Sequence, residues 1–81
     1  MYLQTLMKDL VEIIAKSLVD NPEEVHVNEI QGEQGLILEL RVAPEDMGKV
    51  IGKQGRIAKA IRTVMKAVAT RENVKVVVEI V

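Results

Sequence analysis

A four-residue turn with a glycine at each end, Gly52-Lys53-Gln54-Gly55, lies within the most basic part of the 81-residue chain. Residues 47–71 carry seven positive side chains and no acidic one, whereas the other 56 residues carry four bases and twelve acids. The segment therefore has a charge of +7 and the remainder −8, although the whole chain has only −1. This separation predicts a polyanionic partner. The seven basic residues are Lys49, Lys53, Arg56, Lys59, Arg62, Lys66 and Arg71.

The glycine turn is suited to binding phosphate. A glycine backbone can approach a bulky ligand closely because it has no side chain. A helix is expected to begin just after the turn, where free N–H groups and the positive end of the helix dipole attract anions. Lys53 and Arg56 add positive charge at this point. A turn between two helices also uses glycine simply to reverse the chain direction, so the turn alone leaves both interpretations open.

The side chains do not favour catalysis. The chain has no cysteine, one histidine (His26) in a predicted strand and one serine (Ser17) inside a predicted helix. A Walker-type phosphate loop needs four residues between its first glycine and the Gly-Lys-[Ser/Thr] ending. Gly48 and Gly52 are separated by three residues, and Gln54 stands where Ser or Thr is required. We therefore expect a protein that is not an enzyme and uses neither a cofactor nor a metal.

The apolar spacing predicts three helices and three strands, because some segments repeat at helical spacing and others alternate. Pro44 suits the first turn of a short helix, where Glu45 and Asp46 complement the dipole. The alternation is interrupted at Glu29-Ile30, which predicts a bulge. The expected elements are helix 3–18, strand 25–31, strand 36–42, helix 44–51, helix 56–70 and strand 74–80.

These elements predict one α+β domain over residues 1–81. The first two strands are expected to form an antiparallel hairpin around Gly32-Glu33-Gln34-Gly35. The last strand follows about 30 residues of helix, so a right-handed crossover should place it parallel to the second strand. The result is a three-stranded mixed sheet with all three helices on one face. A chain of this length has no room for a second core.

The helix at 56–70 is expected to carry a basic face. Lys59, Arg62 and Lys66 share one side of the helical wheel with no acid among them, so the usual Glu–Lys pairs of an exposed helix are missing. This favours ligand binding, although a simple solvated face remains an alternative. The residues expected to face the sheet are Ile57, Ile61, Val64 and Val68.

A further flank of this helix has the spacing of a dimer seam. Ala60, Val64 and Ala67 lie at positions i, i+4 and i+7, and the two alanines would let a partner helix approach closely. The alternative is that this flank packs under the first helix.

The chain is expected to be soluble and cytoplasmic. No apolar run approaches the roughly 18 residues of a membrane span, and the N-terminus lacks the basic-then-apolar order of a signal peptide. The absence of cysteine fits a reducing compartment.

The stretch Val50-Ile51-Gly52-Lys53-Gln54-Gly55-Arg56-Ile57, between two helices and after a strand, closely resembles the V-I-G-x-x-G-x-x-I core of KH domains. The KH G-x-x-G loop clamps about four backbone nucleotides. The element order is similar to the type II, bacterial arrangement, and over the whole chain the sequence resembles the small stand-alone KH proteins of the KhpA family. This resemblance implies a cytoplasmic RNA-binding protein, an RNA chaperone, that acts as a homodimer or with a larger Jag-type (KhpB) KH partner. It also implies a link to cell-wall synthesis and cell shape.

The resemblance also implies which residues contact RNA. Gly52 and Gly55 would bring the backbone against phosphates while Lys53 and Arg56 neutralise charge. Bases would lie over Ile51 and Ile57, with the edge of strand 74–80 opposite, although both isoleucines could equally be core residues. The full expected contact set is Ile51, Gly52, Lys53, Gln54, Gly55, Arg56, Ile57, Lys49, Lys59 and Arg62.

An alternative function is a protein-interaction module. In that case the basic helix would bind an acidic protein surface rather than RNA, and competition by single-stranded RNA would separate the two.

Overall fold

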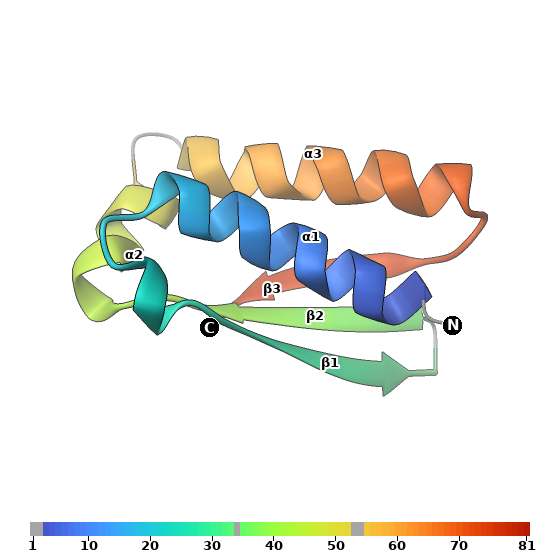
Figure 1. The fold of residues 1–81 in the computed structure, drawn as a ribbon. Coiled ribbons are helices and arrows are strands. Elements are labelled where there is room, and N and C mark those ends of the chain that lie inside the picture. The colour runs from blue at the N-terminus through green and yellow to red at the C-terminus, as the bar shows by residue number, and fades with distance from the viewer. Residues whose placement is uncertain (1–2, 34, 53–54) are drawn as a thin grey trace.

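The computed structural model describes residues 3–33, 35–52 and 55–81. Its elements are α1 (Leu3–Leu18), η1 (Pro22–Glu24), β1 (His26–Gly32), β2 (Gly35–Arg41), α2 (Pro44–Ile51), α3 (Arg56–Arg71) and β3 (Val76–Ile80). The order of helices and strands is the predicted one, with the short 3-10 helix η1 added before the first strand. Helices α1 and α3 lie side by side above the sheet, and α2 lies at one end (Figure 1).

The three strands form one sheet in the order β1-β2-β3, with β1 antiparallel and β3 parallel to β2. Pairing runs without interruption along all seven residues of β1. The predicted bulge at Glu29-Ile30 is therefore wrong. Ile30 pairs directly with Ile37 and breaks the alternation only because it is an apolar residue on the open side of the sheet, 41% exposed.

The core lies between the helices and one face of the sheet. The inward-facing leucines of β2 are buried, as their alternation predicted, and α1 and α3 cover them. The largest fully buried apolar side chains are Met7, Leu38, Leu40, Ile61, Met65, Val11 and Val50. The predicted α+β fold with a mixed sheet is confirmed. None of the described helices combines the length and apolar character that crossing a membrane requires.

The last strand starts later than predicted, at Val76 rather than Val74. The chain leaves α3 through Asn73, which has a positive φ of 57°. The N–H of Val74 then donates to the Ala69 carbonyl at 2.9 Å. This bond caps the helix end in the manner of a C-terminal capping motif, and it keeps Val74 out of the β-ladder.

Candidate nucleic-acid interface

The turn between α2 and α3 needs glycine at its first position. Gly52 follows the last residue of α2 and donates its N–H to the Gly48 carbonyl at 2.7 Å. A Cβ atom at position 52 would collide with that same carbonyl oxygen. Any larger residue would therefore have to move the end of α2.

Gly55, at the end of the turn, is required for a different reason. Its φ of 63° is in the left-handed region, which is unfavourable for residues with a Cβ atom. Its N–H donates to the Gly52 carbonyl at 2.8 Å, which closes the turn directly before α3. No described atom lies within 4 Å of the position that its Cβ would take. Lys53 and Gln54, both predicted to contact RNA, lie outside the described residues.

Ile51 and Ile57 flank the turn and differ in burial. Ile51 is 52% exposed, although the preceding Val50 is fully buried and anchors α2. Ile57 is partly buried and packs against the core. Ile51 therefore presents apolar surface beside the turn. Ile57 also lies near the turn, but part of its side chain packs in the core.

Helix α3 carries an exposed row of bases. Arg56, Lys59, Arg62 and Lys66 are all exposed, and no acid occurs between positions 56 and 71. These four residues form the basic stripe. Its positive charges have no acidic neighbour on the same helix, so the stripe is free to bind an external anion.

The core-facing side of α3 agrees with the prediction at Ile61, which is buried, but not at Val64. Val64 was expected to face the sheet, but it is 38% exposed, and Val68 is only partly buried. The buried face of α3 combines two alanines with two large side chains, and Val64 lies outside it. The buried residues of α3 are Ala58, Ile61, Met65 and Ala69. Ala60, Val64 and Ala67, the predicted dimer seam, are exposed on the single chain.

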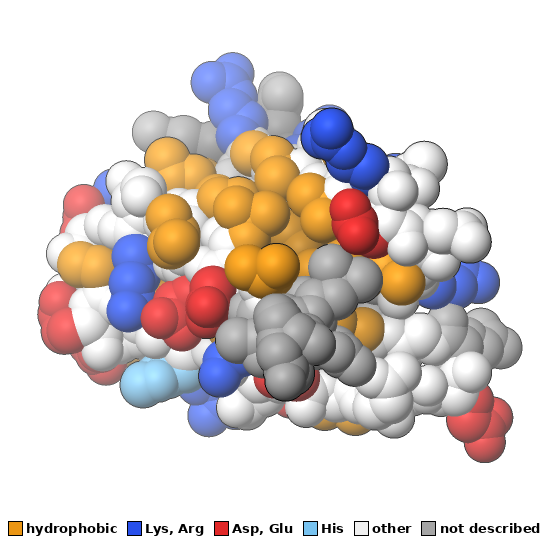
Figure 2. Space-filling model, turned by 45° about the vertical axis from the view of Figure 1, so that its right-hand side comes forward, with side chains coloured by type: hydrophobic (Ala, Val, Ile, Leu, Met, Phe, Trp, Pro, Cys, Tyr) orange, Lys and Arg blue, Asp and Glu red, His pale blue; other side chains and the backbone are white. Residues whose placement is uncertain are grey.

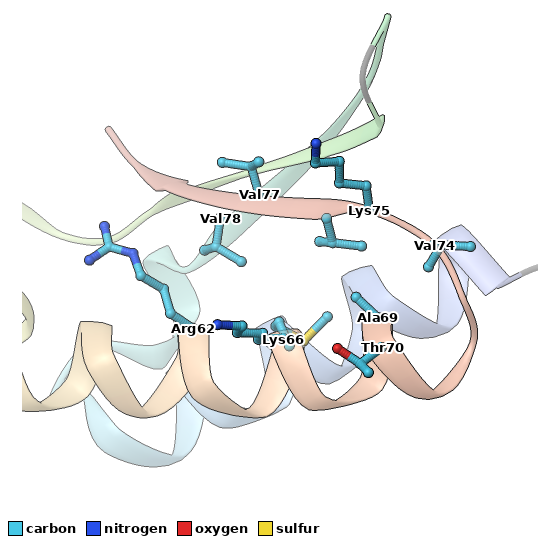
Figure 3. Close-up of a pocket in the computed structure, with 10 residues that line it drawn as sticks. Arg62, Lys66, Ala69, Thr70, Val74, Lys75, Val77 and Val78 are labelled. Atoms are coloured by element: carbon cyan, nitrogen blue, oxygen red, sulfur yellow. The ribbon is translucent and has the colours of Figure 1, made fainter.

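A groove of about 420 Å³ lies between the second half of α3 and β3. Arg62 and Lys66 extend toward it from the helix, and Val78 points into it from the strand (Figure 3). Thr70 and Val74 line it near the turn that joins helix and strand. Lys66 and Thr70 were absent from the predicted contact set. The helical wheel had nevertheless placed Lys66 on the basic face of the helix, with Thr70 beside it.

Lys49, another predicted contact, is ion-paired in the structure. Its Nζ lies 3.0 Å from Oδ2 of Asp20, and the two side chains are 43% and 74% exposed. Exposed ion pairs contribute between about 0 and 1 kcal/mol. Lys49 can therefore exchange this partner for a phosphate at small cost.

Asp46 fixes the start of α2, the helix that leads into the turn. Its side chain is 1% exposed. Oδ1 accepts the N–H of Asp20 at 3.1 Å, and Oδ2 accepts the N–H and side-chain amide of Asn21 at 3.0 and 3.1 Å. Burial by itself raises the pKa of Asp46, but these hydrogen bonds and the charge of Lys49 together lower the pKa below its ordinary value. The carboxylate thus ties the end of α1 to α2.

Comparison with known proteins gives consistent matches over nearly the whole chain. The sequence model of the family described as "KhpA/KhpB, KH domain" matches residues 8–80. The chain is 79% identical over 75 residues to the RNA-binding protein KhpA of Clostridium perfringens, which covers 93% of this chain and 100% of that protein. It is 54% identical over 74 residues to the RNA-binding protein KhpA of Aquifex aeolicus, covering 91% and 94% of the two chains. No solved structure matches the chain significantly.

Proposed function

The chain belongs to the KhpA/KhpB KH-domain family, and we propose on this premise that it binds single-stranded RNA. Its relatives in Clostridium perfringens and Aquifex aeolicus are named RNA-binding proteins. The observation that carries the proposal is the exposed basic stripe, which leads from the glycine turn to the groove between α3 and β3 with no acid on the way.

RNA phosphates contact the turn first in this proposal. The bare backbone at Gly52 and Gly55 admits them closely, and the first N–H groups of α3 point toward them. Arg56 supplies positive charge there, and Lys53 and Gln54 complete the contact. The phosphate path then follows the helix along Lys59, Arg62 and Lys66, with Lys49 on the other side of the turn.

The bases contact aliphatic surface in this proposal. Ile51 and Ile57 lie beside the turn, and the valines of β3 line the groove beyond. Tyr2, which lies outside the described residues, is the only aromatic residue of the chain. Stacking on several aromatic rings, as in RRM and OB-fold proteins, is therefore not available. We expect weak binding, aided by backbone hydrogen bonds to the edge of β3.

The test is a change of the turn that leaves the core intact. Lys53→Asp with Gln54→Asp places two negative charges where phosphate is expected. Fluorescence anisotropy with a labelled single-stranded RNA should show that binding is lost, while the melting temperature barely changes. RNA affinity equal to that of the wild type would contradict the proposal.

The control for this variant has the same charge change at another site. Lys16→Asp with Gln31→Asp alters exposed residues of α1 and β1. General electrostatic repulsion would weaken RNA binding equally in both variants, whereas a clamp at the turn makes the first variant much weaker.

The family resemblance extends the proposal to the cell. We propose that the protein acts in the cytoplasm as an RNA chaperone together with a larger Jag-type (KhpB) KH protein, with a role in cell-wall synthesis and cell shape. The match to the family described as KhpA/KhpB supports the choice of a KhpB-type partner. A strain lacking the protein should regain normal cell length with the wild-type chain but not with the Lys53→Asp, Gln54→Asp variant. Full rescue by the variant would separate cell shape from RNA binding.

We also propose that the dimer seam of Ala60, Val64 and Ala67 joins two chains. All three residues are exposed, and the neighbouring Val68 lines a hollow together with Leu6 and Ile13 of α1, which are 61% and 62% exposed. Hydrophobic side chains gather over this side of the molecule (Figure 2). Pairing there would place two basic stripes in one particle.

A further inference from the structure

The groove between the second half of α3 and β3 has a charged lining that is entirely basic. Arg62, Lys66 and Lys75 line it, with no acid among the described residues. Glu72, at the end of α3, lines the hollow beside α1 instead. Lys75 points to the side of β3 away from α3 (Figure 3), so Arg62 and Lys66 supply the positive charge on the helix side. The groove therefore suits a polyanionic strand whose phosphates run beside the helix.

The strand side of the groove offers backbone groups to the bases. The N–H of Leu36 in β2 donates to the Lys75 carbonyl at 2.9 Å, and Leu36 is the register partner of Val76. Alternate residues of a parallel strand bond to the neighbouring strand. Lys75 therefore turns its backbone groups toward β2, and the N–H and C=O of Val76 and Val78 face the open edge beside the groove.

Thr70 is the only side chain with a hydroxyl or amide group among the described residues that line this groove. It lies about one helical turn after Lys66 on α3 (Figure 3). A hydroxyl inside a helix can bond the carbonyl four residues earlier, as that of Ser17 does with Ile13 at 2.7 Å. Within the described part of the chain, Thr70 makes no such bond. Its hydroxyl is therefore open to a ligand.

The end of α3 holds Thr70 in place. The N–H of Asn73 donates to the Thr70 carbonyl at 3.2 Å, and the N–H of Val74 donates to the Ala69 carbonyl at 2.9 Å. Ala69 is buried, whereas Thr70 beside it is exposed. A β-branched side chain also has few rotamers in a helix. The hydroxyl is therefore preorganised, and binding a ligand there costs little conformational entropy.

We propose that Thr70 hydrogen-bonds the 2′-hydroxyl of a ribose in the groove and thereby gives the protein a preference for RNA over single-stranded DNA. This role rests on the proposed RNA binding, which places the strand between α3 and β3. There the sugar joins a phosphate beside Lys66 to a base at the edge of β3, so it lies next to Thr70. A threonine hydroxyl both donates and accepts a hydrogen bond, as the 2′-hydroxyl does.

The test compares RNA and DNA affinities of the full-length protein and its Thr70→Val variant. The probes are a short labelled RNA of mixed sequence and its all-2′-deoxy counterpart, which keeps uracil so that only the 2′-hydroxyls differ. Fluorescence anisotropy should show that the wild type binds the RNA more tightly. Thr70→Val keeps the shape of the side chain and removes the hydroxyl. It should lower RNA affinity about three- to tenfold, as expected for one hydrogen bond, and leave DNA affinity unchanged.

A second threonine of α3 gives the matched control. Thr63 is exposed on the same helix but does not line the groove, so Thr63→Val should keep the wild-type ratio of RNA to DNA affinity. Thr70→Ser retains a hydroxyl and should keep most of the preference for RNA. Circular dichroism and melting curves check that each variant is folded.

Several outcomes would overturn this role of Thr70 while leaving RNA binding intact. Equal loss of RNA and DNA affinity in Thr70→Val would mean that the hydroxyl contacts a phosphate or a base. The role is also wrong if the wild type does not distinguish the two probes, if Thr70→Val keeps the wild-type ratio, or if Thr63→Val or Thr70→Ser changes the ratio as much as Thr70→Val does. A wild type that binds no RNA would remove the proposed function and this role together.

Discussion

At the scale of single residues, the two glycines of the turn act through different physical constraints. Gly55→Ala puts a Cβ atom on a residue with a φ of 63°, which costs about 1–2 kcal/mol. Gly55→Asn should cost less, because asparagine tolerates this conformation. Gly52→Ala should be the most damaging, since its Cβ collides with the Gly48 carbonyl oxygen. Urea unfolding measures all three variants. Equal stability of the two alanine variants would contradict the assignment.

The buried carboxylate of Asp46 is the residue that ties α1 to α2. Asp46→Asn removes its negative charge and faces an amide NH₂ toward the N–H donors of Asp20 and Asn21. We expect its melting temperature at pH 7 to fall more than that of Asp20→Asn, which alters only an exposed ion pair. Thermal unfolding followed by circular dichroism compares the two.

The difference in melting temperature between the wild type and Asp46→Asn should depend on pH. Folding lowers the pKa of Asp46 below its ordinary value, so the unfolded chain takes up the proton at a higher pH than the folded one. The carboxylate thus stabilises the fold fully above its unfolded pKa of about 3.9, and this contribution is lost as the pH falls through the lower folded pKa. The gap in melting temperature between wild type and Asp46→Asn should shrink below about pH 4. A gap that stays constant at lower pH would contradict this.

At the scale of elements, periodicity predicted which segments form helices and strands. The features that it missed depend on tertiary contacts. The alternation of β2 gave its buried face correctly because one side of the strand packs on the core. The inward side of α3 was predicted correctly at Ile61 and wrongly at Val64, because the full set of buried residues depends on how the helix packs on the sheet and its neighbours. Asp46 was predicted only to complement the dipole of α2. The residues whose N–H groups its carboxylate accepts, Asn21 and Asp20, lie 25 and 26 positions away in the sequence, so local patterns could not identify them.

Substitution of Val64 tests whether the flank of α3 formed by Ala60, Val64 and Ala67 belongs to the core or joins two chains. It is 38% exposed, so Val64→Asp should leave the circular dichroism spectrum native. If the seam joins two chains, the mass measured by light scattering should fall to that of one chain. Thr63→Asp, a neighbouring exposed position, serves as the control with the same added charge. A native monomer in the wild type, or an unchanged dimer in Val64→Asp, would contradict the proposed seam.

At the scale of the whole molecule, the net charge of −1 conceals two chemically different surfaces. One module that clamps about four nucleotides neutralises few phosphates. If about three are neutralised, the logarithm of the RNA association constant should fall with the logarithm of salt concentration with a slope near −2. Anisotropy titrations from low to physiological salt measure the slope. Affinity that does not depend on salt would remove the electrostatic basis of the proposed binding.

The location of RNA on the folded protein tests the central claim most directly. A single-stranded RNA oligonucleotide should be titrated into ¹⁵N-labelled protein while every backbone amide is followed by NMR. The account predicts the largest shifts at Gly52, Gly55 and Arg56, continuing along α3 to Arg62 and Lys66, with β1 unaffected. Shifts confined to α1 or to the face of the sheet that points away from the helices, with the glycine turn unchanged, would contradict it.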